Sequence, residues 1–260
     1  MLSKNQVKYI QSLHQKKFRQ QHGAFLVEGA KSVQEVLQSD FQTELVIATD
    51  EFYKENSRLT DHQRSPVEIA SAADLERIGT LGSNNAAIAV VRTKENRPLV
   101  INSGEIALIL DDIRDPGNLG TILRIADWYG VRSILCSDTT ADVYNPKVIS
   151  ASKGSFTRVQ WWYGDITQFL HQSTGGAERA TPVYGAFLEG ADVHTLPFAP
   201  SGYLVMGNES NGISPAVERY VTQRVTIPRY GDAESLNVGI ATAVLLDNWR
   251  RGRGGGPLLT

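Results

Sequence analysis

Apolar and polar positions in the first third of the chain follow the alternation of a small α/β unit. Three apolar residues set among basic ones predict a short amphipathic helix over residues 4–19. Spacings of three and four predict a helix around Val33 and the start of another at Ala73. A polar segment with a proline, residues 92–98, ends the unit and is typical of a linker. Short apolar runs predict four strands, at residues 24–29, 45–49, 67–70 and 87–91.

A second α/β unit follows the linker. An apolar run at 106–110 predicts a strand, and another at 133–136 follows after a turn and a helix. This βαβ order requires a parallel sheet. The buried face of the helix is predicted to consist of Leu119, Ile122, Leu123, Ala126 and Tyr129. Further strands are predicted at 203–206 and 224–227. A last helix is predicted at about 235–250, and the residues expected to face the core are Leu236, Ile240, Ala243 and Val244.

We therefore expect two α/β domains, residues 1–96 and residues 97–250, and a flexible glycine-rich tail at 251–260. The 260 residues are 41% hydrophobic, which is enough to form such cores. No apolar stretch reaches the length of a membrane span and the amino terminus has no signal-peptide core, so a cytoplasmic location is the default expectation. The single cysteine, Cys136, is expected to be a small buried residue and not a nucleophile.

The distribution of charge is more informative than the formal net charge of −2. The first 27 residues contain five Lys or Arg, two His and no Asp or Glu. One interpretation is a solvated helix face. The other is an electropositive arm for phosphate groups, which needs local and not net charge. On the second interpretation, the candidates for phosphate contacts are Lys8, Lys16, Lys17 and Arg19.

Two loops that follow predicted strands have an unusual composition. The first, residues 114–118, places Asn118 after Asp-Pro-Gly at the start of a helix that contains Arg124. Helix starts expose free N–H groups, so this turn suits an anion or a polar ligand. Alternatively, Asn118 caps its helix and Arg124 faces solvent. The second loop, residues 207–213, places Glu209 between two glycines, which permit close approach of a ligand to the backbone.

The third such loop, residues 227–237, contains a proline, a glycine and the pair Ser235 and Asn237 before the last helix. In open α/β sheets, ligands bind beyond the carboxyl ends of the strands, so three such loops can form one site. No G-x-G-x-x-G sequence follows a predicted strand, which argues against a dinucleotide-binding enzyme. The histidines and the cysteine show no metal-ligand spacing, so no metal is expected.

The order of these motifs resembles that of one protein family. Three segments are similar to the three motifs of the SpoU (TrmH-like) class of RNA ribose 2′-O-methyltransferases, in the SPOUT superfamily. They are DPGNLG-TILR, VMGNESNGI and IPRYGDAESLNVGIATAVLL. FLVEGAKSVQEVL and the basic helix before it resemble the family's substrate-binding domain. Residues 145–155 also match a family stretch near the active site. The resemblance covers nearly the whole chain apart from the glycine-rich tail.

The resemblance implies a fold, a cofactor and a set of site residues. The fold is an α/β domain whose carboxyl-terminal segment forms a deep trefoil knot, an exception to the rule of unknotted chains. S-adenosylmethionine binds in the knot, and the active site forms across a homodimer. The cofactor contacts correspond to Gly207, Ile227 and Leu236. The polar residues of the active site correspond to Asn118, Arg124, Glu209, Ser235 and Asn237.

Methyl transfer to a ribose hydroxyl needs a group that takes the hydroxyl proton. In the family, an arginine that matches Arg124 has been proposed as that base, but arginine is almost always protonated. We therefore expect Arg124 to clamp the target phosphate and Asn118 to orient the ribose, with Ser235 or Glu209 assisting. The proton acceptor stays unassigned. The substrate is expected to be RNA and not DNA, because only RNA has the 2′-hydroxyl.

Within this class the sequence favours one substrate and leaves two alternatives. An amino-terminal domain of this type is commoner among enzymes that act on large-subunit (23S) rRNA, so we expect rRNA as the substrate before tRNA. The other alternative is a non-catalytic, ribosome-associated RNA-binding protein with the same fold. The intact Asn118, Arg124 and Glu209 argue against that alternative.

Overall fold

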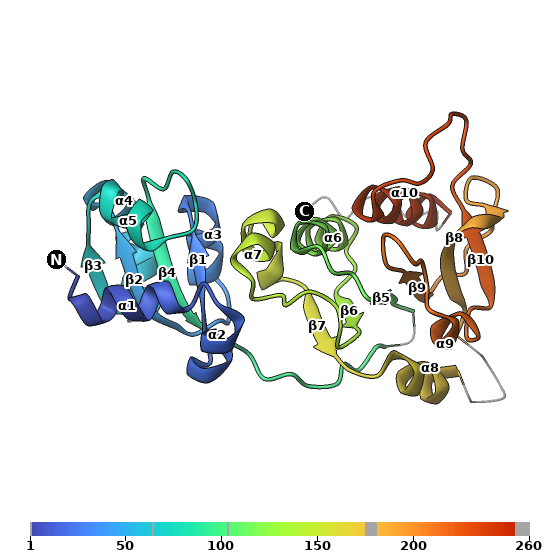
Figure 1. The fold of residues 1–260 in the computed structure, drawn as a ribbon, viewed down its shortest axis with the longest axis horizontal. Helices are drawn as coiled ribbons and strands as arrows, with labels where there is room; N and C mark the ends of the chain where they lie inside the picture. Colours follow the sequence, from blue (N-terminus) through green and yellow to red (C-terminus); the bar gives the residue numbers. More distant parts are fainter. Residues whose placement is uncertain (1, 64, 103, 175–180, 253–260) are drawn as a thin grey trace. The chain divides into compact units, whose positions relative to one another are not determined.

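The structure is a computed structural model that describes residues 2–63, 65–102, 104–174 and 181–252 (Figure 1). Its contacts divide the chain into two compact units, Met1–Glu95 with Asp142–Arg158 and Asn96–Ala141 with Val159–Thr260. The division after Glu95 lies inside the polar segment 92–98. The segment Asp142–Arg158 belongs to the first unit, whereas our domain assignment gave it to the second. Residues 253–260 of the expected flexible tail lie outside the described residues.

The first unit is built on a four-stranded mixed sheet with the strand order β1-β4-β2-β3. β4 pairs antiparallel with both β1 and β2, and β2 pairs parallel with β3. Ile10, Leu26, Ile47, Leu75 and Ile88 are buried in its core. The elements are α1 (Lys4–Ser12), α2 (Lys16–His22), β1 (Ala24–Glu28), α3 (Ala30–Leu37), β2 (Thr43–Ala48), α4 (Asp50–Gln63), β3 (Val67–Ile69), α5 (Ala72–Ile78), β4 (Ala87–Arg92), α7 (Pro146–Ser152) and the 3-10 turn η1 (Ser155–Thr157).

The predicted single helix over 4–19 is two helices, α1 and α2, so that prediction was wrong. α1 ends at Ser12, and the chain turns through Leu13 and His14 before α2 begins. The carbonyl oxygens of Leu13 and His14 accept hydrogen bonds from Arg19 Nη1 at 3.0 and 2.9 Å. The arginine of α2 thus satisfies backbone oxygens that the interrupted helix leaves open. The apolar spacing did not reveal this break, because Leu13, in the turn after α1, is buried in the same core as Ile10.

The segment Asp142–Arg158 is held in the first unit by aromatic packing and by two ion pairs, Arg19 with Asp142 and Arg158 with Glu35. Arg19, 3% exposed, donates from Nη2 and Nε to Asp142 Oδ2 at 2.7 and 3.2 Å. Phe25 of β1 packs against Tyr144 and Phe156, with ring centroids 4.6 and 6.1 Å apart. Such pairs add to the gain from apolar burial. Sequence patterns within the segment gave no indication of these partners, which lie more than a hundred residues away.

The second unit contains a six-stranded, all-parallel sheet with the order β10-β8-β9-β5-β6-β7. All residues of β5, β6 and β9 are buried, as expected for strands covered on both faces. None of the helices in the described ranges is long and apolar enough to cross a membrane. The elements are β5 (Ile106–Leu110), α6 (Pro116–Trp128), β6 (Ser133–Cys136), β7 (Gln160–Tyr163), α8 (Ile166–Thr174), β8 (Val183–Asp192), β9 (Gly202–Met206), α9 (Pro215–Glu218), β10 (Gln223–Thr226) and α10 (Val238–Arg251).

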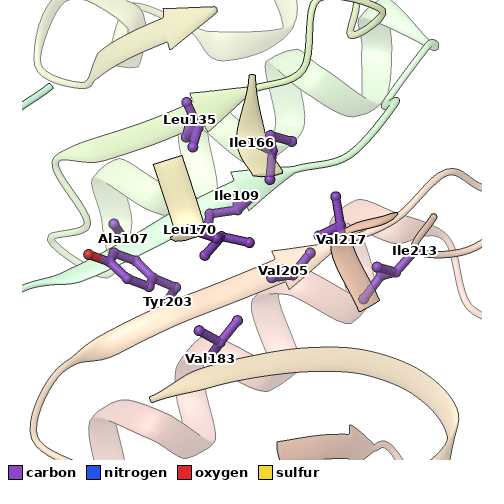
Figure 2. Close-up of a cluster of buried hydrophobic side chains, with 10 residues drawn as sticks. All are labelled: Ala107, Ile109, Leu135, Ile166, Leu170, Val183, Tyr203, Val205, Ile213 and Val217. Atoms are coloured by element: carbon purple, nitrogen blue, oxygen red, sulfur yellow. The ribbon is translucent and has the colours of Figure 1, made fainter. Parts of the chain in front are cut away.

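One face of this sheet forms a continuous apolar core. Figure 2 shows Ile109 and Val205 from the neighbouring central strands, with Leu170 and Val217 from helices packed against them. Each of these side chains is at most 3% exposed. Cys136 is buried at the end of β6, and burial raises the pKa of its thiol, as expected of a residue that is not a nucleophile. This rigid sheet fixes the positions of the loops that follow its strands.

Helices α6 and α10 pack side by side and run in the same direction. Asn237, just before α10, bonds to Asn118 near the start of α6. At the other ends, Arg250 Nε donates to the carbonyl oxygen of Tyr129 at 2.7 Å. The amino-terminal ends of both helices therefore meet at one place, although more than a hundred residues separate them in sequence.

The predicted buried face of the last helix was wrong for two of its residues. Leu236 and Ile240 are 51% and 53% exposed. The helix begins only at Val238, after the Asn237 cap. Its buried face is instead Val238, Gly239, Thr242, Leu245, Leu246 and Trp249. The Trp249 ring stacks on Phe198, with centroids 5.1 Å apart, which selects this face over the alternative.

We expect the Arg19→Ala variant to lose about 3 kcal/mol of stability in the first unit, because it leaves a partly buried carboxylate and two carbonyl oxygens without donors. Hydrogen exchange of the β1 amides measures this loss. The matched control is Lys17→Ala, an exposed cation of the same helix, which should change stability by less than about 0.5 kcal/mol. Equal losses for the two variants would contradict a structural role for Arg19.

Candidate functional site

Three loops meet beyond the carboxyl ends of the strands of the second unit. β5 and β9 are neighbours in the sheet, with Leu110 opposite Met206, so the loops that follow them start side by side. The third loop follows β10 and ends at the amino terminus of α10, which packs on α6. In open α/β sheets, ligands bind beyond the carboxyl ends of the strands, which is where these loops begin.

The side chain of Asn118 joins all three loops. Its Nδ2 donates to Glu209 Oε1 at 2.8 Å, and its Oδ1 accepts from Asn237 Nδ2 at 2.8 Å. Asn118 does not cap its own helix, because Asp115 Oδ1 accepts from the Asn118 backbone N–H at 2.8 Å. The alternative that Asn118 is only a helix cap is therefore wrong. The capping role of Asp115 was missed, although aspartate before proline is a recognised helix-start signal.

Asn237 has two roles at once. Its Oδ1 accepts from the backbone N–H groups of Gly239 and Ile240 at 2.9 and 3.3 Å, which caps α10. Its Nδ2 is left to donate to Asn118. The cap fixes which way the amide points, so the donor faces Asn118 without further ordering.

The loop that contains Glu209 is closed on itself. The backbone N–H of Asn208 donates to the oxygen of Gly212 at 2.9 Å, and the reverse bond has the same length. Gly212 has φ 69°, a region that favours glycine. A Cβ on Gly207 would lie 2.2 Å from the Gly212 backbone carbon, so glycine is required at position 207 as well. The Glu209 carboxylate is exposed at the tip of this tight turn.

Asn118, Glu209 and Asn237 form the Asn118 cluster. No contact in the described part of the chain connects Arg124 or Ser235 to it. Arg124 is exposed on α6 and forms no hydrogen bond or ion pair with any residue in the described ranges. Trp128, one turn further along α6, is 83% exposed. Ser235 is exposed in the third loop, and no hydrogen bond of the described chain engages its side chain. The structure therefore groups Asn118, Glu209 and Asn237 and leaves these two residues outside the group.

The three residues expected to hold the cofactor lie in or at the ends of two loops. Gly207 follows β9, Ile227 follows β10, and Leu236 precedes α10. Among the described residues, the backbone hydrogen bonds of loops, turns and caps do not involve these three. Their N–H and carbonyl groups are thus open to a ligand, which suits recognition through the backbone. The described residues contain no group of three His, Cys, Asp or Glu that could hold a metal ion.

The expected phosphate contacts of the first unit differ in exposure. Lys8, Lys16 and Lys17 are exposed on α1 and α2. Arg19 is buried, and its guanidinium donates to Asp142 and to two carbonyl oxygens. The interpretation of Arg19 as an RNA contact is therefore wrong, because the group it would offer is already occupied inside the unit.

Two family models match the chain. The model of the SpoU rRNA Methylase family matches residues 105–247, more than half of the chain and nearly all of the second unit's elements. The model of the MRM3-like substrate binding domain matches residues 4–89, most of the first unit.

Similar proteins cover almost the full length of the chain. The 23S rRNA (guanosine(2553)-2′-O)-methyltransferase RlmP of Bacillus subtilis (strain 168) is 29% identical over 259 residues, covering 95% of this chain and 97% of the relative. A putative RNA methyltransferase of the TrmH family from Porphyromonas gingivalis matches with a TM-score of 0.84 and 38% identity, over 96% of this chain and 99% of that one. An AdoMet-bound rRNA methyltransferase from Sinorhizobium meliloti matches with a TM-score of 0.85 and 27% identity, over 100% of this chain and 97% of that one.

Proposed function

Because this chain belongs to the SpoU rRNA Methylase family, we propose that it uses S-adenosylmethionine to methylate a ribose 2′-hydroxyl of large-subunit (23S) rRNA. The observation that carries the proposal is the hydrogen-bonded series Glu209–Asn118–Asn237, which assembles the polar residues of three separate motifs. The Bacillus subtilis relative, named for 2′-O-methylation of a 23S rRNA guanosine, gives the substrate class. The Sinorhizobium meliloti relative was solved with AdoMet bound, which gives the cofactor.

Asn118 orients the ribose in this proposal. A carboxamide has two N–H donors and two acceptor lone pairs. One donor is used by Glu209 and one lone pair by Asn237, so one of each remains for a hydroxyl group. Because both neighbours hold the amide in place, binding the ribose costs no reordering of the side chain. Glu209 and Ser235 assist from the adjoining loops.

The backbone groups of Gly207, Ile227 and Leu236 hold S-adenosylmethionine in this proposal. Their uncommitted N–H and carbonyl groups fit a ligand that carries both polar and apolar parts. When bound, the cofactor supplies an electrophilic methyl group on a positively charged sulfur. The chain holds the hydroxyl oxygen and the methyl donor close together, which is the main contribution that positioning makes to such a displacement.

Arg124 clamps the phosphate of the target nucleotide, and a homodimer brings it to the site. Arg124 lies on an α6 surface that has no contact with the Asn118 cluster of its own chain. The same helix pair and the residue before the α10 cap expose three large apolar side chains, Trp128 on α6, Ile240 on α10 and Leu236 just before α10. Exposed apolar groups concentrated on and beside two packed helices are typical of a protein interface. A second copy of the chain bound there covers these groups and places its Arg124 beside a partner's loops.

The first unit binds the structured RNA around the target ribose. Lys8, Lys16 and Lys17 are its proposed phosphate contacts, and Arg19 is no longer among them. The match to the MRM3-like substrate binding domain supports a substrate-binding role for this unit.

Incubation with labelled S-adenosylmethionine and either 23S rRNA or tRNA is expected to label the rRNA, and mapping should place one methyl group on a ribose 2′-oxygen. Asn118→Ala should lower kcat about 100-fold, and Arg124→Ala should lower kcat/KM at least about tenfold. Arg132→Ala, an exposed arginine of the same unit, should keep the wild-type rate. Label in tRNA alone would overturn the rRNA assignment. RNA binding without any transfer would favour the non-catalytic alternative.

Replacing Lys8, Lys16 and Lys17 together by alanine should weaken rRNA binding and reduce the slope of log affinity against log salt by about 2, because fewer counterions are released. Titrations at several salt concentrations measure both quantities. The control removes three exposed cations elsewhere in the same unit, Lys54, Arg58 and Arg77. If the two triple variants lost affinity equally, the assigned contacts would be wrong.

Trp128→Glu and Ile240→Glu are each expected to convert a dimer into a monomer, because a charge in a desolvated apolar interface is unfavourable. Sedimentation velocity measures the change. Val100→Glu is the matched control, since Val100 is also 83% exposed but lies outside the two helices. A wild-type protein that sediments as a monomer at all concentrations would refute the homodimer.

A further inference from the structure

Two consecutive aspartates directly after β5 bind both ends of the loop that contains Glu209. Asp111, which is buried, accepts at Oδ2 from the backbone N–H of Ser214 at 2.7 Å. Asp112 accepts from Asn208 Nδ2 twice, at its backbone oxygen at 2.8 Å and at Oδ2 at 3.2 Å. The first and the last residue of the loop Asn208–Ser214 are therefore both bonded to the turn that follows β5.

The backbone of Asp112 makes this double attachment possible. Successive side chains of an extended strand point to opposite faces, so two neighbouring aspartates do not ordinarily reach one loop. Asp112 has φ 64°, one of two positive values among the described residues other than glycine. Aspartate tolerates this left-handed conformation better than most residues, and such outliers concentrate at functional sites. The turn also lets the Asp112 N–H donate to Ser137 Oγ after β6, at 2.9 Å.

Asn208 connects Asp112 to the backbone around Glu209. Its Nδ2 binds Asp112, and its Oδ1 accepts from the backbone N–H groups of Ser210 and Asn211 at 2.9 and 3.0 Å. Glu209 lies between Asn208 and Ser210, so the hydrogen bonds of the Asn208 side chain fix the backbone on both sides of it. Its carboxylate in turn accepts from Asn118. Asp112 is thus linked to Asn118 by hydrogen bonds at Asn208 and at Glu209, which are neighbours in the chain.

Arg114 keeps Asp112 in the charged form. Its Nε donates to Asp112 Oδ1 at 2.9 Å, leaving Oδ2 for Asn208. This bond holds the pKa of the Asp112 carboxyl below its usual value of 3.8. A lowered pKa means that the charged form persists at neutral pH and is lost only when the pH falls below that value.

We propose that Asp111 and Asp112 are positioning residues for methyl transfer, which hold the Asn208–Ser214 loop so that Glu209 meets Asn118. The expected effect on the rate rests on the proposed function, whereas the role of the two aspartates in holding the loop does not depend on it. Neither aspartate touches the substrate. Their effect on catalysis passes through Asn208 and the loop.

The sharpest test is Asn208→Asp. This change keeps the oxygen that binds Ser210 and Asn211 but replaces the donor facing Asp112 by an acceptor. We expect kcat to fall about 100-fold with little change in the KM for RNA, because a small displacement of a positioned group has effects of that size. Hydrogen exchange at the amides of 209–213 should accelerate. Asn211→Asp adds the same charge to the same loop, has no side-chain hydrogen bond in the described structure, and should behave as wild type.

The exchanged pair Asp112→Asn with Asn208→Asp restores a donor opposite an acceptor. It should raise kcat at least about tenfold above that of Asn208→Asp and slow the hydrogen exchange of the loop amides. Recovery to the wild-type values is not expected, because the backbone oxygen of residue 112 still faces an acceptor. An exchanged pair no better than Asn208→Asp alone, or an Asn208→Asp variant with wild-type kcat and wild-type exchange, would overturn the proposal. If wild-type protein fails to methylate rRNA, the proposed function fails, while the exchange measurements still decide the positioning role.

Discussion

The candidate site depends on one carboxamide, that of Asn118, placed between a donor and an acceptor. Glu209 is 91 residues away in sequence and Asn237 is 119 residues away. Neither bond can form until the parallel sheet has brought β5 and β9 together and α10 has packed beside α6. The site is therefore a property of the completed second unit, and no shorter segment of the chain contains it.

The two units show how differently the same residue types are used. Arg19 lies on α2 among polar residues and Arg124 on α6 between Leu123 and Ile125, and neither neighbourhood shows which arginine is buried. Arg19 is buried because Asp142 and two open carbonyl oxygens surround it. Arg124 faces outward from a helix whose other side fills the core. A buried cation needs a complete set of acceptors, and here those acceptors come from a segment far along the chain.

Much of the architecture could be predicted from the sequence, because apolar runs and loop motifs are local signals. The strands at 106–110 and 133–136 and the buried face of α6 at Leu119, Ile122, Leu123 and Ala126 were predicted correctly. The face of α10 was not, since its phase depends on where Asn237 starts the helix and on the distant partners of Trp249. β8 was missed because its second half is exposed and pairs with β10 through a shifted register. Of the site, the motif residues were recognisable, but the left-handed backbone of Asp112 leaves no signal in composition or spacing.

The path of the chain between the units also governs how the protein is made. The first unit includes Asp142–Arg158, so the chain leaves it after Glu95 and returns some fifty residues later. During synthesis, Phe25 and Arg19 emerge long before Phe156 and Asp142 exist to cover them. The amino-terminal unit therefore cannot finish folding first, as an independent leading domain would, and its incomplete core stays open to chaperones while β5, α6 and β6 are translated. For the same reason, recombination that cuts the gene at the linker would separate this unit from part of its own interior.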